Sequence, residues 1–346
     1  MRTVQIILCG CGGVGKEFLQ LLADRSETIS EKYGFTPVLK SAADLKGAAL
    51  TESDQGLPLA DLVEYLKAGN EVQNFPGFGR PGLSGTEIIA QGAADAIIEA
   101  TPTDLSGGGV GKDHVFGAID QGMEIVSANK GPFVLFYEEL AEKAAARGVG
   151  LHISAATAAA LPTLDVGLTC LAGTRVLSAE GILNGTTNYI LTQMYLNGTS
   201  YDAALQEAQR LGIAETDPSY DVEGKDSANK IVLIANRVFG LKSRLSDVSV
   251  QGITQVTPVD IENAKKQGTV IKLIAQVQDD DGEYRLSVEP KALALDHPLA
   301  AVNDSEKAIS YDTDTMGGIT VMGGKSSPVG AAAALLKDLI NAFKQG

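Results

Sequence analysis

The sequence predicts an α/β protein in which a doubly wound parallel sheet is followed by a second, α+β domain. Three observations support this fold class. Short apolar runs alternate with helical patterns over the first 150 residues, as in consecutive βαβ units. A glycine-rich turn joins the first apolar run directly to the first helical pattern. After about residue 150, strand-like and helical segments are mixed, which indicates a domain of different architecture.

The strands of the parallel sheet are expected where short apolar runs are bounded by glycines or polar turns. Such runs cover residues 4–8, 38–43, 96–100 and 124–128. The spacing of apolar residues predicts helices at residues 16–23, 114–121 and 136–147. A Gly- and Pro-rich stretch at residues 67–85 is expected to be a surface loop.

The second half is expected to combine strands and helices. Strands are predicted at residues 175–184, 271–277 and 284–288, and the last two are joined by a turn at 279–282. Helices are predicted between Ser200, a candidate N-cap, and Gly212, and also at 226–239 and 330–343. We therefore expect a dinucleotide-binding domain at residues 1–150, a catalytic domain at 151–310 and a C-terminal segment at 311–346 that returns to the first domain.

The charge of the chain disfavours nucleic acids and membranes as partners. Lys and Arg number 28 against 43 Asp and Glu, which gives a net charge of −15. Such a surface repels phosphate backbones and anionic lipids. Trp is absent and only 5% of residues are aromatic, which weighs against stacking on single-stranded nucleic acid. The sequence contains no recognisable signal peptide or membrane span, so we expect a soluble, cytoplasmic protein.

The cysteines predict neither a disulfide framework nor a metal site. There are three, Cys9, Cys11 and Cys170, and an odd, small number does not form such a framework. Cys9 and Cys11 have no further Cys or His nearby in the sequence to complete a zinc site, and the three histidines are scattered. We therefore expect the cysteines to be small buried residues in a reducing compartment.

The glycine-rich turn has the spacing of a dinucleotide-binding, Rossmann-type motif, Gly10-x-Gly12-x-x-Gly15. The first glycine permits the tight turn, the second lets the backbone approach a pyrophosphate, and the third lets the helix pack on the strand. Phosphates would then lie at a helix N-terminus, where N–H groups favour anions. The candidate cofactor-binding residues here are Gly10, Gly12, Gly13, Val14 and Gly15. An ordinary tight turn is the alternative.

An acidic residue at the end of the second strand would bind the ribose hydroxyls, and Asp44 is the best candidate. It lies further from Gly15 than the usual spacing of about 20 residues, so a longer helix or an inserted loop must intervene. Asp44 favours NAD, whereas Lys46 could pair with the 2′-phosphate of NADP. The sequence leaves both cofactors open, and Asp44 could also be a plain loop residue.

Further candidates lie in polar segments next to strands or helices. Asp226 and Lys230 are four residues apart at a predicted helix start, so they share one face of it. A surface ion pair is the alternative, but the apolar run at residues 231–235 favours partial burial, which would lower the pKa of Lys230. Lys130 follows a parallel strand, at the edge where such sheets bind ligands. The polar loop at 184–188 would suit a substrate site, or be a plain turn.

These segments together resemble the homoserine dehydrogenases, which interconvert L-aspartate 4-semialdehyde and L-homoserine with NAD(P). The segment from Ala208 to Lys230 fits the signature segment of that family at every required position. Residues 181–188 and 127–132 resemble two further motifs, and the glycine turn and Thr101-Pro102-Thr103 match in place. The resemblance covers essentially the whole chain. It implies a Rossmann domain, a dimerisation segment and a catalytic domain in a homodimer. Family members with a regulatory ACT domain are longer, so we expect none here.

The resemblance also implies residue roles. Lys130 and Lys230 would be the catalytic lysines, with Asp226 beside Lys230, and either lysine could transfer the proton. Glu215, Asp221 and Asp226 would line the amino-acid site, which agrees with the need of a desolvated ammonium group for carboxylates. The substrate carboxylate would meet the segment Asn184, Gly185 and Thr186. Thr101, Thr103 and Lys130 would contact the cofactor.

Two departures from the family pattern leave the substrate open. Ser154 stands where the family commonly has a glutamate that helps to hold a monovalent cation, so a cation site is in doubt. Residues 323–328, with Lys325, Ser326 and Ser327, replace a Gly-Ala-Gly stretch. The alternatives are a related oxidoreductase for another small hydroxy or amino-hydroxy acid, and a catalytically silent dinucleotide sensor. The leading interpretation requires Lys130 and Lys230 to converge at the nicotinamide ring.

Overall fold

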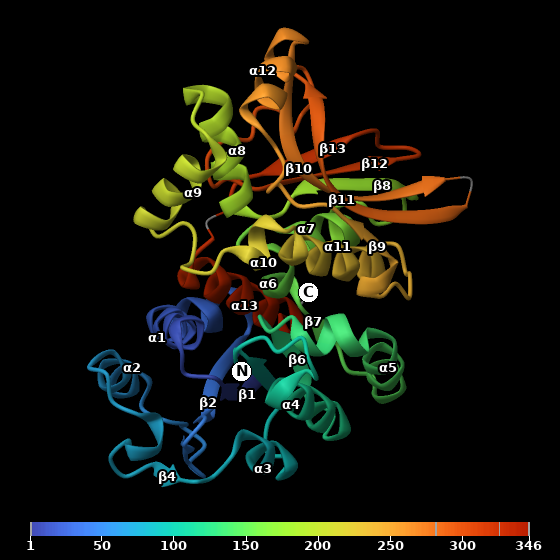
Figure 1. Cartoon of the computed structure of the whole chain (residues 1–346). Coiled ribbons are helices and arrows are strands. Elements are labelled where there is room, and N and C mark those ends of the chain that lie inside the picture. Colours follow the sequence, from blue (N-terminus) through green and yellow to red (C-terminus); the bar gives the residue numbers. More distant parts are fainter. Residues whose placement is uncertain (1, 281, 325, 345–346) are drawn as a thin grey trace. The chain divides into compact units, whose positions relative to one another are not determined.

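The computed structural model describes residues 2–280, 282–324 and 326–344 (Figure 1). The chain divides into two compact units. Unit 1 comprises Met1–Ala159 and Ser327–Gly346, and unit 2 comprises Ala160–Ser326. The boundaries therefore lie beyond the expected 150 and 310, because residues 311–313 and 319–322 still belong to strands in the sheet of unit 2.

Unit 1 contains a seven-stranded sheet with the order β4-β3-β2-β1-β5-β6-β7. Five neighbouring strands, β2, β1, β5, β6 and β7, are parallel, and β3 and β4 add an antiparallel edge. The strands are β1 (Arg2–Cys9), β2 (Phe35–Asp44), β3 (Gly47–Leu50), β4 (Gly79–Pro81), β5 (Ala96–Glu99), β6 (Glu124–Ser127) and β7 (Leu151–His152). The predicted α/β class and its four parallel strands are confirmed, whereas the antiparallel edge was not expected.

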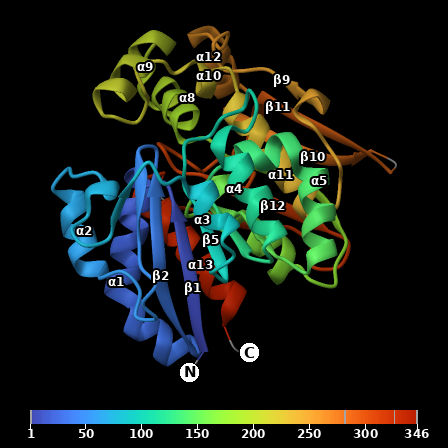
Figure 2. The same ribbon diagram turned by 90° about the horizontal axis from the view of Figure 1, so that it is seen from below.

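Helices cover both faces of this sheet. The helical segments are α1 (Gly13–Tyr33), α2 (Leu59–Lys67), η1 (Val72–Asn74), α3 (Gly85–Ala90), α4 (Gly109–Asp120), α5 (Gly131–Arg147), α6 (Ser154–Ala158) and α13 (Pro328–Phe343). Apolar residues of α1, α2 and α13 share one core cluster with β1, and Figure 2 shows α13 beside α1. Helix α4 packs against β5 and β6. The predicted loop at 67–85 contains η1 and β4, so that expectation is corrected.

Unit 2 contains a six-stranded sheet with the order β13-β12-β8-β10-β11-β9. Its strands are β8 (Val176–Ile182), β9 (Val248–Val250), β10 (Thr269–Asp280), β11 (Glu283–Ala294), β12 (Ala308–Thr313) and β13 (Ile319–Met322). The long strands β10 and β11 form the hairpin that the sequence predicted, and each is longer than expected. Asp281, one residue of the predicted turn, lies outside the described residues.

Helices of unit 2 pack on this sheet and place polar residues at its ends. They are α7 (Thr163–Asp165), η2 (Val166–Cys170), α8 (Gly185–Asn197), α9 (Tyr201–Arg210), α10 (Ser219–Val222), α11 (Lys225–Val238), η3 (Leu245–Asp247) and α12 (Pro258–Lys266). The apolar run after Lys230 is buried where α11 packs on β10 and β11. Ser200 caps α9 as predicted, because its hydroxyl accepts the Ala203 N–H. Among the described helices, none is long and apolar enough to cross a membrane.

Candidate active site

The glycine turn of unit 1 has the geometry of a phosphate cradle. Gly10 has φ +98°, and a Cβ there would lie 2.6 Å from the Ala100 backbone. A Cβ at Gly15 would lie 1.9 Å from the Gly10 carbonyl oxygen. A Cβ at Gly12, by contrast, would meet nothing within 4 Å. Fold geometry therefore requires the first and third glycines, whereas the second leaves open space at the start of α1, where N–H groups favour an anion.

Asp44 ends β2 next to this turn. Its carboxylate accepts the Cys11 N–H at 3.2 Å, and both residues line a pocket of about 270 Å³ that also includes Lys16. The unusual distance from Gly15 in sequence is explained by α1, which extends to Tyr33. Lys46 lines the same pocket, and its ammonium pairs with the exposed carboxylate of Glu71.

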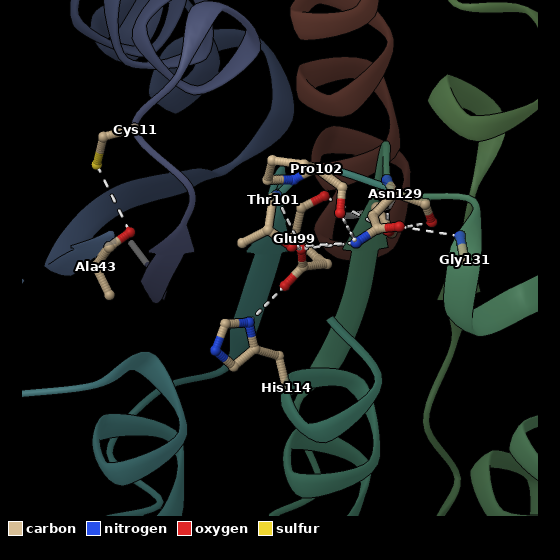
Figure 3. A network of polar contacts seen from close by, with 9 residues as sticks. Cys11, Ala43, Glu99, Thr101, Pro102, His114, Asn129 and Gly131 are labelled. Carbon is tan, nitrogen blue, oxygen red and sulfur yellow. Dashed lines mark hydrogen bonds and ion pairs between the residues drawn. The ribbon is translucent and has the colours of Figure 1, made fainter. Parts of the chain in front are cut away.

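A buried polar network joins the loops that follow β5 and β6 (Figure 3). The Glu99 carboxylate, which is 0% exposed, accepts the Thr101 N–H at 2.9 Å and also the Thr101 hydroxyl. The Asn129 amide donates to the Thr101 hydroxyl at 3.1 Å and accepts the Gly131 N–H at 2.9 Å. Lys130, between them, donates its backbone N–H to the Thr103 hydroxyl at 3.3 Å. The loops after β5 and β6 are thus joined by hydrogen bonds, and they contain three predicted cofactor residues, Thr101, Thr103 and Lys130.

Beside this network lies a cluster of three residues that are distant from one another in the sequence. Cys9, Glu99 and His114 lie with their potential ligand atoms within 4.8 Å of one another, and all three are buried. Glu99 and His114 are distant from Cys9 in the sequence, so the sequence did not reveal this cluster. His114 Nδ1 lies 2.7 Å from a Glu99 oxygen, so this cluster is a buried hydrogen-bonded pair beside a thiol whose pKa is raised by burial. Cys170 is exposed, which corrects the expectation that every cysteine is buried.

In unit 2, Lys230 and Asp226 form a close ion pair on α11. The Lys230 Nζ lies 2.5 Å from Asp226 Oδ2 and donates to the Leu183 carbonyl at 2.8 Å. The two side chains are only 12% and 8% exposed, so the pair is largely buried. It is not the surface ion pair that was the alternative interpretation of the sequence. A helical i,i+4 spacing brings the residues together, and the end of β8 supplies the second acceptor.

Asn184 links this pair to a second carboxylate. Its Nδ2 donates to Asp221 Oδ1 at 2.8 Å and to Asp226 Oδ2 at 2.9 Å. Its Oδ1 accepts the Thr187 N–H at 3.0 Å, which makes Asn184 the N-cap of α8. Both N–H groups of the amide are therefore committed to the two carboxylates.

These residues line one pocket of about 280 Å³ within unit 2. Six predicted site residues meet there: Asn184, Gly185, Thr186, Asp221, Asp226 and Lys230. The same pocket is lined by Gly212, Ile213, Ser305 and Ser326. Glu215, the remaining predicted acid, is exposed and does not line this pocket; its carbonyl accepts the Gln209 amide at 3.1 Å.

Comparison with known proteins identifies the family of the chain. Residues 162–340 match the model of the family described as homoserine dehydrogenase. A homoserine dehydrogenase of Methanocaldococcus jannaschii is 38% identical over 98% of both chains. The chain belongs to the homoserine dehydrogenase family. It is therefore an oxidoreductase of this class, and the resemblance seen in the sequence is confirmed.

Two further homoserine dehydrogenase relatives support the assignment. The NAD(+)-dependent homoserine dehydrogenase of Pseudomonas canavaninivorans is 34% identical, and the alignment covers 99% of this chain and 96% of the relative. The crystal structure of a proposed homoserine dehydrogenase from Archaeoglobus fulgidus is 32% identical, with a TM-score of 0.87. That alignment covers 99% of this chain and 100% of the other. The predicted fold class is thus shared with a family structure.

Two of the departures from the homoserine dehydrogenase pattern, Ser154 and Ser327, take part in hydrogen bonds to or within α13. Ser154 is buried, and its N–H donates to the Asp338 carboxylate at 2.9 Å, which ties α6 to α13. Ser327 caps α13 by accepting the Gly330 N–H at 3.2 Å, and Ser326 lines the pocket of unit 2. Lys325, the third departing residue of that loop, lies outside the described residues.

Sequence reasoning missed Ser305 as a lining residue of this homoserine dehydrogenase pocket. Ser305 lies more than 70 residues after Lys230, in a loop with no glycine motif, so neither spacing nor composition marked it. One signal was available in principle. Gly185 must be glycine because a Cβ there would lie 2.8 Å from the Ser305 carbonyl oxygen. A required glycine indicates a close backbone approach, but it does not say which segment approaches.

Proposed function

We propose that the chain interconverts L-homoserine and L-aspartate 4-semialdehyde with a nicotinamide cofactor, and that the substrate binds in the pocket of unit 2. The observation that carries this proposal is the partly buried set of Lys230, Asp226 and Asp221 around one cavity. A cavity of about 280 Å³ is near the lower end of the size range of small-molecule sites, which suits an amino acid. The homodimer expected from the family is part of the proposal.

The pocket offers complementary groups to both ends of homoserine. Its ammonium group needs carboxylates once water is excluded, and Asp221 and Asp226 supply them. Its carboxylate would lie at the start of α8, where Gly185 and Thr186 line the pocket and the helix N-terminus favours anions. Glu215 lies outside this cavity, so we assign it no contact with the substrate.

Lys230 is proposed to move the proton at the reacting oxygen. In the direction of aldehyde reduction, its ammonium group donates a proton to the forming alkoxide. In the direction of alcohol oxidation, its neutral amine accepts the hydroxyl proton. Asp226 and the Leu183 carbonyl fix the Nζ in place. Lys130 is proposed as the second catalytic lysine, and its backbone position is set by Thr103 and Asn129.

The residues of unit 1 fit a dinucleotide, which supplies the hydride donor or acceptor when bound. Gly12 to Gly15 would hold the pyrophosphate, because Gly12 leaves open space before the N-terminus of α1. Asp44 would accept the ribose hydroxyls, and its negative charge would repel a 2′-phosphate. Lys46 is paired with Glu71, so the 2′-phosphate of NADP would have to compete with the Glu71 carboxylate for Lys46. We therefore propose NAD as the preferred cofactor.

Initial rates with L-homoserine in NAD and in NADP test this proposal. We expect turnover, with the higher kcat/KM in NAD. Parallel runs with added potassium or sodium chloride show whether a monovalent cation is needed, and Ser154 leads us to expect little dependence. Absence of turnover with both cofactors would contradict the proposal. Turnover of another hydroxy amino acid in place of homoserine would identify the alternative oxidoreductase.

A further inference from the structure

Lys272 of β10 is a lysine buried in the sheet of unit 2. Its side chain is 0% exposed. The Nζ donates to the Val302 carbonyl, to Asn188 Oδ1 at 3.2 Å and to Asn303 Oδ1 at 3.4 Å. All three acceptors are neutral oxygens. A buried ammonium group is costly unless it is hydrogen-bonded in this way, and burial lowers the pKa of Lys272 to about 8.

The acceptors of Lys272 belong largely to one loop, residues 302–306. Asn188 of α8 donates its amide to the Val302 and Glu306 carbonyls, each at 3.1 Å. The Asp304 N–H donates to the Thr192 hydroxyl at 3.2 Å. Asp304 itself has φ +51°, a left-handed conformation that Asp adopts more readily than most residues with a Cβ. The loop is held in this conformation by hydrogen bonds with side chains of α8 and β10.

The same loop forms part of the pocket wall. Ser305 lines the cavity with Asp226 and Lys230. The Ser305 carbonyl also lies so close to Gly185 that a Cβ on that glycine would be 2.8 Å away. A shift of the loop would therefore move Ser305 at the pocket and change its contact with Gly185 at the start of α8.

Stability alone does not explain a lysine at this position. Lys272 faces Lys291 across the β10–β11 pair, and directly opposed like charges are unfavourable. A methionine has similar length and would avoid the desolvation of a charge. The feature that a methionine could not supply is the hydrogen bonding from Nζ to the 302–303 segment.

We propose that Lys272 is a positioning residue whose buried ammonium group holds the 302–306 loop, and with it Ser305, at the wall of the substrate pocket. The link to homoserine rests on the proposed function, whereas the link to the loop rests on contacts within unit 2. Lys272 acts on the substrate only through the loop, so its loss should weaken substrate binding more than the chemical step.

The test compares Lys272→Met with Lys291→Met. Lys291 is the matched control, because it lies opposite in the same sheet and contacts Gln276 and Glu289 instead of the loop. We expect Lys272→Met to raise the KM for homoserine roughly tenfold, with kcat within about threefold, which is the pattern of lost binding that is equal in the ground state and the transition state. The control should leave both constants near the wild-type values. Lys272→Gln, which retains an N–H donor, should restore part of the affinity.

Hydrogen exchange provides a readout that does not depend on turnover. In Lys272→Met, amide exchange should accelerate at residues 302–306 and stay near wild type in β10 and β11. An unchanged KM together with unchanged loop exchange would overturn the proposal, and so would uniform acceleration across unit 2. If Lys272→Met does not fold, Asn303→Ala removes one acceptor and is expected to produce a smaller effect of the same kind. Absence of homoserine turnover in the wild type would contradict the proposed function, and loop exchange would still decide the role of Lys272.

Discussion

At the scale of single residues, Asn184 shows how one amide can organise two acids. Asp221 and Asp226 are two carboxylates in a partly buried pocket, and they would repel each other if no N–H donor lay between them. Asn184 supplies an N–H to each and caps α8 with its oxygen. Its committed donors make it a positioning residue in our account, where the sequence had suggested direct substrate binding.

We predict that Asn184→Asp lowers kcat/KM for homoserine by roughly 100-fold or more, since a buried charge replaces two N–H donors. The new carboxylate still accepts the Thr187 N–H, so the cap of α8 is kept, but a third carboxylate, buried beside Asp221 and Asp226, should also lower the melting temperature. Asn184→Ser, which adds no charge, should lose less activity. Steady-state kinetics and thermal unfolding measure both effects. A wild-type kcat/KM in Asn184→Asp would exclude the positioning role.

Residues were predictable where their chemistry is encoded locally. The i,i+4 spacing of Asp226 and Lys230 predicted a shared helix face, and the apolar run behind them predicted burial. Lys272 and Ser305 were not recognised, because their roles come from a loop that returns from a distant part of the chain. A lysine in a strand has no local feature that distinguishes a buried position from an exposed one.

At the scale of elements, the β1–α1 turn separates two uses of glycine. Gly15 is needed for packing, because a Cβ would lie 1.9 Å from the Gly10 carbonyl oxygen. Gly12 has ordinary backbone angles and open space, so its lack of a side chain serves an approaching ligand. The strand–turn–helix order made both positions predictable, but only the structure distinguishes their roles.

We therefore predict that Gly15→Ala destabilises the protein by about 2 kcal/mol or more, the scale of overpacking a tight site. Gly12→Ala should leave stability near wild type and weaken NAD binding at least tenfold, because the methyl group would occupy the path of the pyrophosphate. Chemical denaturation and calorimetric NAD titration of the two variants provide the comparison. Equal stability of the two variants would refute the packing role of Gly15.

Two strands that the sequence did not predict, β3 and β4, share a physical reason. β3 and β4 have four and three residues, too few to show an alternating pattern. Their antiparallel pairing depends on the neighbouring strand β2, not on their own composition. The longer elements α11 and α13 were predicted closely, because their apolar spacing extends over several turns.

At the scale of the whole molecule, unit 1 is built from both ends of the chain. α13 packs on α1, and Phe343 near the C-terminus lies 6.0 Å from Phe35, centroid to centroid. The proposed substrate pocket is lined by residues of unit 2, which the chain forms between these two parts of unit 1. One uninterrupted segment therefore carries Lys230, its acids and the loop held by Lys272.

The central claim of this account is that Lys230 moves the proton in a homoserine dehydrogenase reaction. The most direct measurement is kcat for homoserine oxidation by Lys230→Ala, with Lys225→Ala as the control. Lys225 lies on the same helix, but its side chain is 57% exposed and pairs with Glu223. We predict that Lys230→Ala lowers kcat by at least about 100-fold, the scale of a positioned acid or base, and that Lys225→Ala stays near wild type. A near-normal kcat in Lys230→Ala would contradict the account.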